Sequence, residues 1–217
     1  PLNASPVTTT LPAFEEKLEA SHGQLNVNVG FYAGLIPGNA HHLEALMQAG
    51  VVGVKCFLTH SGIDEFPNVT EKDLDEAMPI IAKYKLPLLA HCELYDKEVD
   101  SDFDNHPTSY QHYLASRPKQ WENNAVALMI RMCRKHQCSV HIVHVASDEA
   151  LTLIEAAKQE GLPITAETCS QYIYFNAEAI PDGKTIYKCA PPIRNRANNQ
   201  HLKAAFLSGV LDLITTD

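Results

Sequence analysis

Short, largely apolar runs, each followed by one polar residue, recur along this chain. The four clearest runs, with the residue that follows each, are Val51–Val54 before Lys55, Leu86–Ala90 before His91, Val140–Val143 before His144, and Leu211–Thr216 before Asp217. Runs of this length between turn residues are typical of buried parallel strands. In a β/α barrel the carboxyl ends of such strands meet on the face that holds the chemistry. We therefore expect the four polar residues to lie on that face.

The pattern as a whole predicts strands that alternate with amphipathic helices. The predicted strands are 24–30, 53–58, 86–91, 139–144, 164–167 and 211–216. Helices are predicted at 39–49, 119–136 and 198–207. Two more helices are predicted from their ends: one is capped by Thr70 together with Asp73, and the other is capped by Ser147 and ends at Gly161. Residues 33–38 are predicted to form a loop. This alternation predicts an α/β fold with a parallel sheet, and we favour a partial TIM-type (β/α)8 barrel. An open doubly wound sheet stays open as an alternative, although no GxGxxG motif begins a helix.

Composition narrows the classes of partner. The 217 residues suffice for one core, so a single domain over 1–217 is expected, and the net charge of −9 disfavours a nucleic-acid partner. No apolar stretch approaches the roughly 18–20 residues that span a membrane, so no membrane partner is expected. The six cysteines contain no CxxC pair, which favours reduced thiols inside a cell.

The connection between Cys92 and Pro118 is long for a βα loop. Its acidic and aromatic residues are Glu93, Asp96, Glu98, Asp100, Asp102, Asp104, Tyr110 and Tyr113. Two interpretations stay open: a solvated acidic loop, or a rim or lid over a site. His106 and His112 also lie in this connection, and surface roles are expected for both.

Each candidate site residue has a structural alternative. A lone histidine at a strand end is more often structural, but His91 and His144 in equivalent positions favour metal binding. Lys55 either extends its ammonium to the rim or is a desolvated nucleophile that forms a carbamate with CO2. Asp217 is either a turn carboxylate or a metal ligand that accepts the proton of attacking water. Ser61 either forms a polar turn or hydrogen-bonds a polar substrate.

Several ordered motifs carry a family resemblance. They are Gly53–Leu58, Ser61-Gly62, Leu89–Glu93, Tyr113–Pro118, His141–Ser147, Glu167–Cys169, Lys188–Arg194 and Thr216-Asp217. Together they resemble the allantoinase family, in the cyclic-amidase branch of the amidohydrolase superfamily. The resemblance covers essentially the whole chain.

The resemblance implies an enzyme of purine catabolism that opens the hydantoin ring of allantoin to give allantoate. It implies a pair of divalent metal ions, expected to be zinc, held by a carboxylated Lys55, by His91, by His144 and by Asp217. Asp217 would also be the general base, and backbone near Ala190, together with Ser61, would bind the substrate. A homo-oligomer, a tetramer, is expected, inside the cell in the cytoplasm or in an organelle such as a peroxisome or mitochondrion.

The sequence departs from the family in one respect. The His-x-His metal pair that ends the first barrel strand is not in this chain, and His41-His42 has the wrong spacing to replace it. We therefore expect an internal piece of a longer protein that lacks the first barrel strands and is inactive by itself. The alternatives are a dihydropyrimidinase or hydantoinase, and a non-catalytic barrel relative that acts only in assembly.

Overall fold

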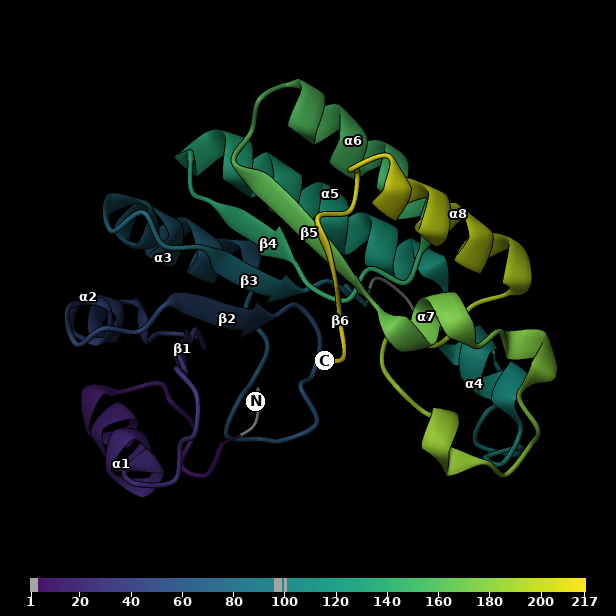
Figure 1. Ribbon diagram of the computed structural model, residues 1–217, viewed down its shortest axis with the longest axis horizontal. Helices are drawn as coiled ribbons and strands as arrows, with labels where there is room; N and C mark the ends of the chain where they lie inside the picture. The colour runs from purple at the N-terminus through teal and green to yellow at the C-terminus, as the bar shows by residue number, and fades with distance from the viewer. Residues whose placement is uncertain (1–3, 96–98, 100) are drawn as a thin grey trace. The chain divides into compact units, whose positions relative to one another are not determined.

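The computed structural model describes residues 4–95, 99 and 101–217. Its strands follow one another in the order β1-β2-β3-β4-β5-β6, as Figure 1 traces from purple to yellow, and the pairs β1–β2, β2–β3 and β5–β6 are parallel. The strands are β1 (Tyr32–Gly34), β2 (Gly53–Phe57), β3 (Leu88–His91), β4 (Val140–Ile142), β5 (Ile164–Cys169) and β6 (Leu213–Thr215). The helices are α1 (Leu11–Ser21), α2 (Ala40–Gln48), α3 (Glu71–Lys83), α4 (Tyr110–Ser116), α5 (Lys119–His136), α6 (Leu151–Gln159), α7 (Ser170–Tyr174) and α8 (Arg196–Leu207), with short 3-10 turns η1 (Asp148–Ala150), η2 (Ala177–Ala179) and η3 (Thr185–Tyr187).

This strand order confirms the predicted fold class. A doubly wound sheet reverses its strand order at a switch point, whereas consecutive parallel strands in sequence order are the pattern of a (β/α)8 barrel. The chain therefore has an α/β fold with the parallel arrangement of a partial barrel. In the described residues, no helix is both long and apolar enough to cross a membrane. None of the six cysteines, all of which are described, is in a disulfide.

The chain divides into two compact units, and the division falls within α5 and β4. The first unit comprises Pro1–His91 and Leu128–His141. In it β2 pairs with β1 and with β3, with Phe57 opposite His91, and α2 packs against α1 and α3. Every residue of β2 and β3 is buried, which explains why both strands are continuous apolar runs.

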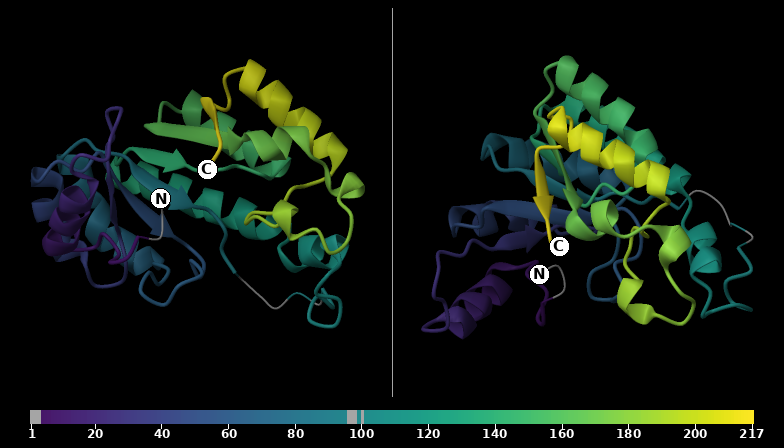
Figure 2. Two further views of the ribbon diagram at one scale, coloured as in Figure 1. Left: turned by 60° about the horizontal axis from the view of Figure 1, so that its bottom comes forward. Right: turned by 45° about the vertical axis from the view of Figure 1, so that its right-hand side comes forward.

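The second unit comprises Cys92–Ala127 and Ile142–Asp217. In it β5 pairs with β6, with Cys169 opposite Thr215, and the α6 helix packs on β5. The short α7 helix contacts both β5 and α8. Figure 2 shows it, in green, directly after the end of β5. Long connections are part of this unit, and they hold α4, η2 and η3.

Two local predictions are confirmed by the helices. The α5 helix has the predicted bounds, and Ala125, Leu128, Met129 and Met132 on its apolar face are buried. Thr70 and Asp73 form the predicted capping box at the start of α3, in which the Asp73 carboxylate accepts hydrogen bonds from the Thr70 N–H at 2.8 Å and from the Thr70 hydroxyl at 2.6 Å. Local spacing alone therefore located these elements.

Three local predictions are wrong. Residues 24–30 form no strand: Val27 and Val29 are 74% and 44% exposed, so their alternation has no core to face. The first strand is instead β1, whose last two residues, Ala33 and Gly34, fall in the predicted loop 33–38. Ser147 does not cap the following turn with its side chain, because its hydroxyl donates to Asn123 Oδ1 at 2.9 Å. The helices α1, α4 and α7 were not predicted.

Candidate functional site

In the first unit, Lys55 and His91 lie beside the same aromatic ring. Lys55 is on β2 and His91 ends β3, and they are 4% and 5% exposed. The Lys55 ammonium lies 4.9 Å from the centroid of the Phe57 ring. The His91 imidazole stacks on the same ring at 5.1 Å between centroids. The two predicted ligands are thus brought together around Phe57, and a buried amine and a buried imidazole are donors of the type a metal site uses.

In the second unit, His144 and Asp217 both have left-handed backbone conformations. His144 follows β4 with φ of 42° and is 2% exposed, and the N–H of the next residue, Val145, donates to the Glu167 carbonyl at 2.7 Å. Asp217 has φ of 62° and is exposed. Positive φ in residues other than glycine is uncommon and is often retained where side-chain placement matters.

Two thiols lie within the electrostatic influence of Asp217. Burial raises the pKa of Cys169 to about 12, and the charge of Asp217 contributes in the same direction. Burial also raises the pKa of Cys189, again with a contribution from Asp217. Asp217 therefore lies near the beginning of the segment Cys189–Arg194, which the sequence motifs associate with substrate binding.

That segment, which we call the 189–194 loop, is held by three tyrosine hydroxyls. Tyr113 donates to the Cys189 carbonyl at 2.6 Å, Tyr172 to the Pro191 carbonyl at 2.7 Å and Tyr110 to the Ile193 carbonyl at 3.0 Å. Alternate carbonyls are therefore anchored, and the exposed Ala190 lies between two of them. Sequence analysis named Tyr110 and Tyr113 but not Tyr172, and it predicted none of these three bonds, because the partners are 76, 19 and 83 residues away along the chain.

Buried charges connect the same loop to the turn after His144. Both Ala146 and Ser147 donate their N–H groups to Glu122 Oε1, at 2.7 and 2.8 Å. Glu122 Oε2 lies 3.7 Å from the Arg194 guanidinium, which donates to the Arg117 carbonyl at 2.7 Å. Burial raises the pKa of Glu122 to about 7, against the opposing effects of Arg194 and the two N–H donors.

Glu93, at the start of the long acidic connection, is fully buried and forms a two-pronged ion pair with Arg117, whose Nε donates to Oε1 at 2.9 Å and whose Nη2 donates to Oε2. Asp102 and Asp104 are exposed, as a solvated loop would have them. The remaining predicted acids of this connection, Asp96, Glu98 and Asp100, lie outside the described residues. Glu93 is therefore part of the buried framework of the unit rather than of a solvated loop.

The hydroxyl of Ser61 is used in a local turn. It donates to the Ile63 carbonyl at 3.2 Å and accepts from the Ile63 N–H at 3.4 Å. The neighbouring His60 accepts the Gly62 N–H at 3.1 Å, and its other ring nitrogen lies 3.4 Å from Asp64. This geometry is that of a polar turn. A role in substrate binding for Ser61 stays a prediction.

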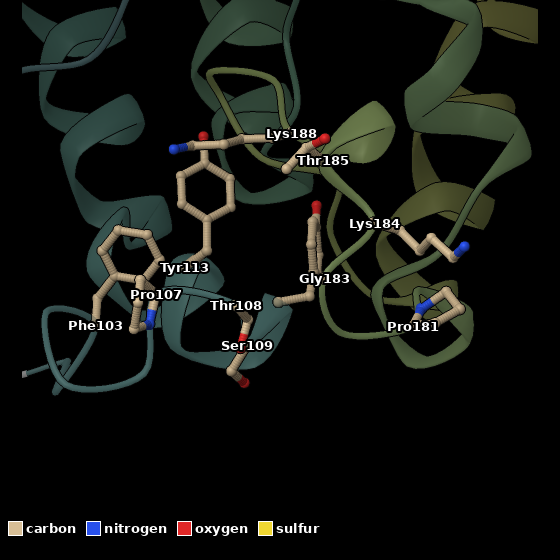
Figure 3. A pocket seen from close by; sticks show the side chains of 11 residues that line it. Phe103, Pro107, Thr108, Ser109, Tyr113, Pro181, Gly183, Lys184, Thr185 and Lys188 are labelled. Carbon is tan, nitrogen blue, oxygen red and sulfur yellow. The ribbon is translucent and has the colours of Figure 1, made fainter.

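Two features of the second unit were not predicted to be functional. Asp102, His106 and His112 place their ligand atoms within 4.8 Å of one another. A cavity of about 100 Å³ is formed by residues 103–113 and 181–188, and Figure 3 shows Phe103 and Tyr113 on one side of it and Lys184 and Pro181 on the other. The Lys188 ammonium lies 5.7 Å from the Phe103 ring and 5.4 Å from the Tyr113 ring.

Comparisons with known proteins agree with these motifs. The chain is 39% identical over 229 aligned residues to an allantoinase of Arabidopsis thaliana, 41% over 217 to a mitochondrial allantoinase of Aquarana catesbeiana, and 41% over 221 to an allantoinase of Saccharomyces cerevisiae. All of this chain is covered in each case, but only 45%, 45% and 48% of those proteins. The chain thus spans about half the length of the curated relatives it matches. No family model matches it.

Solved structures give the same fold. An L-hydantoinase (dihydropyrimidinase) from Arthrobacter aurescens matches with a TM-score of 0.87 and 28% identity, over 97% of this chain and 47% of that one. A dihydropyrimidinase from Brevibacillus agri matches with a TM-score of 0.84 at 21% identity, over 95% of this chain and 46% of that one. The second likeness is evidence for the fold alone.

Proposed function

We propose that this chain is the part of a cyclic amidohydrolase that opens the hydantoin ring of allantoin to give allantoate. The observation that carries the proposal is the 39–41% identity to allantoinases of three organisms over every residue of the chain. The likeness to an L-hydantoinase, at 28% identity, supports the wider reaction class of cyclic-amide hydrolysis. The activity belongs to the full-length protein, and we propose that residues 1–217 alone are inactive.

We propose that two divalent ions, zinc in particular, are held by Lys55, His91, His144 and Asp217. Zinc accepts donors of these types. The imidazoles of His91 and His144 are 5% and 2% exposed, and the amine of Lys55 is 4% exposed. Asp217 adds a carboxylate. The Lys55 amine would first add to CO2 and lose a proton, which gives a carbamate with two oxygen donors. The bound ions supply Lewis-acid chemistry at the ring carbonyl.

The remaining roles fall to the chain's own groups. Asp217 accepts the proton of the water that attacks the ring carbonyl. Backbone groups at Ala190, in the tyrosine-anchored 189–194 loop, orient the planar ring amide by hydrogen bonds. Ser61 leaves its turn contact with Ile63 to bond the ureido group of allantoin, which needs polar partners once it leaves water.

A side-by-side assay of the full-length protein tests the substrate. We expect a higher kcat/KM for allantoin than for dihydrouracil or 5-phenylhydantoin. Ser61→Ala should narrow this preference by on the order of 1–3 kcal/mol, because a polar ureido group would lose its partner. Thr152→Ala, which removes an exposed hydroxyl bonded to Glu149 in the other unit, is the control. A preference for dihydrouracil would show that the substrates are dihydropyrimidines rather than allantoin. The assignment to the cyclic amidohydrolases would still hold.

Metal content tests the ligands independently of the substrate. His91→Ala and His144→Ala should each lower the zinc content of the full-length protein, because each removes a nitrogen donor. Wild-type zinc content in both variants would rule out the ligand assignment. A non-catalytic relative acting only in assembly would show neither zinc nor turnover.

Assembly and location are proposed with the function. We propose a homo-oligomer, a tetramer, located inside the cell in the cytoplasm or in an organelle. Light scattering of the full-length protein measures the number of subunits, and fractionation of the source cells measures the location. A monomer or a secreted protein would contradict them.

A further inference from the structure

The connection between β3 and α5 brings together three groups that can bind a metal ion. Asp102 and His106 come from the irregular part of the connection, and His112 comes from α4. Their ligand atoms lie within 4.8 Å of one another. None of the three is among the residues to which we assign the reaction.

The Asp102 carboxylate is held in a defined orientation. Its Oδ1 accepts the Asn105 side-chain N–H at 2.6 Å, and its Oδ2 lies 3.0 Å from His106 Nδ1. Asp102 also has a positive φ, of 52°, like His144 and Asp217. The hydrogen bond from Asn105 lowers the pKa of Asp102, and the two imidazoles add to this effect. A carboxylate fixed by a neighbouring amide is how protein ligands are kept in place for a metal ion.

The two imidazoles lie side by side. Their rings stack with centroids 4.3 Å apart and planes 15° apart. His112 Nδ1 is buried and has no hydrogen-bond partner among the described residues, although buried polar atoms normally have one. His112 therefore has a ring nitrogen that is available to coordinate an ion, in a residue that lies near a second imidazole and a carboxylate.

We propose that Asp102, His106 and His112 bind a divalent transition-metal ion such as Zn²⁺. Two imidazole nitrogens and one carboxylate oxygen are donors that Zn²⁺ favours, and a water molecule completes a tetrahedron. Tetrahedral bonds of about 2.0–2.1 Å place ligand atoms roughly 3.3 Å apart, so pairs of ligand atoms that now lie as far as 4.8 Å from one another must approach by up to about 1.5 Å. Parallel stacked rings do not converge on one ion. The exposed His106 therefore rotates out of the stack when the ion binds.

The surroundings of the proposed metal site leave it accessible from solvent and connect it to the 189–194 loop. A depression of about 530 Å³ is lined by Asp102 and Asn105, which leaves the carboxylate reachable from solvent. The ion would tie the irregular segment to α4, the helix that carries Tyr110 and Tyr113. Those two tyrosines anchor the Ile193 and Cys189 carbonyls of the 189–194 loop. The bound ion is therefore expected to stabilise the support of that loop.

Metal counting on the full-length protein tests the site. Wild type and the variants His106→Ala, His112→Ala and Asp102→Asn are equilibrated with Zn²⁺, passed over a desalting column and analysed for zinc per subunit, and calorimetric titration with Zn²⁺ gives the affinities. We expect each variant to hold one zinc fewer than wild type, or to bind that ion at least tenfold more weakly. The test compares the zinc count of each variant with that of wild type. Its outcome therefore does not depend on how many zinc ions the catalytic site holds.

A matched control is available in the same unit. His201 and Asp148 form an exposed histidine–carboxylate pair at 2.6 Å, so His201→Ala removes a comparable pair without touching the proposed site. His201→Ala should retain the wild-type zinc count and affinity. Asp102→Asn keeps a residue that tolerates positive φ, and circular dichroism of each variant checks folding. Equal zinc counts and affinities in wild type and all three folded variants, or an equal loss in His201→Ala, would overturn the proposal.

Discussion

Replacing Tyr172 by phenylalanine removes one of the three hydroxyls that hold the 189–194 loop. Tyr172 is 1% exposed, and its hydroxyl donates to the Pro191 carbonyl at 2.7 Å. Burial raises the pKa of Tyr172 well above its ordinary value, so the hydroxyl stays a donor over the usual working range of pH. Phenylalanine fills the same ring volume, so the change isolates the hydrogen bond.

The expected cost follows from the burial of both partners. A hydrogen bond contributes about 0.5–1.5 kcal/mol net, but a buried acceptor left without its donor costs about 1–3 kcal/mol. Pro191 is buried, so the larger range applies. Tyr172→Phe should therefore lower the free energy of unfolding of the full-length protein by about 1–3 kcal/mol. If the 189–194 loop orients the ring amide as we propose, its loosening should raise KM while the zinc content stays constant.

Urea unfolding and steady-state kinetics measure these two effects. Tyr174→Phe on the same helix is the matched control, because Tyr174 is 79% exposed and its change should stay within about 0.5 kcal/mol. An unchanged urea midpoint in Tyr172→Phe, at an unchanged slope, would refute the anchoring role. Equal losses in both variants would show that the effect is not specific to the loop.

Three further changes follow from local geometry. The raised pKa of Glu122, about 7 against 4.5, means that ionisation is disfavoured in the folded state, so stability should fall between about pH 4.5 and pH 7 by roughly 3 kcal/mol. Glu122→Gln should flatten that fall in a pH series of urea midpoints. Thr70→Ala should cost about 1 kcal/mol in urea unfolding, because it breaks the capping box with Asp73. Gly34→Ala should cost about 1–3 kcal/mol in the same assay, because its new Cβ would lie 2.4 Å from Phe66 Cε2.

Strong local patterns account for the parts of the fold that were predicted. The α5 helix was predicted with its observed bounds because 18 residues repeat one apolar face. By contrast, residues 24–30 have the alternation of a strand, but Val27 is 74% exposed, and a strand needs a partner and a core that the pattern itself cannot supply. The strand β1, with only three residues, is too short to show a period.

The residues of the candidate site also fall into those that a local pattern identified and those that it did not. Lys55, His91 and His144 were identifiable because each follows an apolar run, and all three are buried. Only His91 ends its strand, because Lys55 lies in the middle of β2 and His144 lies two residues after β4. The tyrosine anchors were not, because a hydroxyl that donates to a carbonyl 76 residues away leaves no local signal. His106 and His112 were assigned to the surface, and Asp102 was left between a solvated loop and a rim or lid, because an irregular loop has no period that places side chains together.

Chemical rescue of Lys55→Ala is the measurement that most directly tests the central claim. If Lys55 supplies a carbamate to a metal pair that opens allantoin, Lys55→Ala in the full-length protein should lose allantoin hydrolysis by orders of magnitude. Added acetate or propionate should then restore part of it, because a small carboxylate can supply the two missing oxygen donors. Near-normal turnover without added acid would contradict the account, as would a loss that no short-chain acid restores.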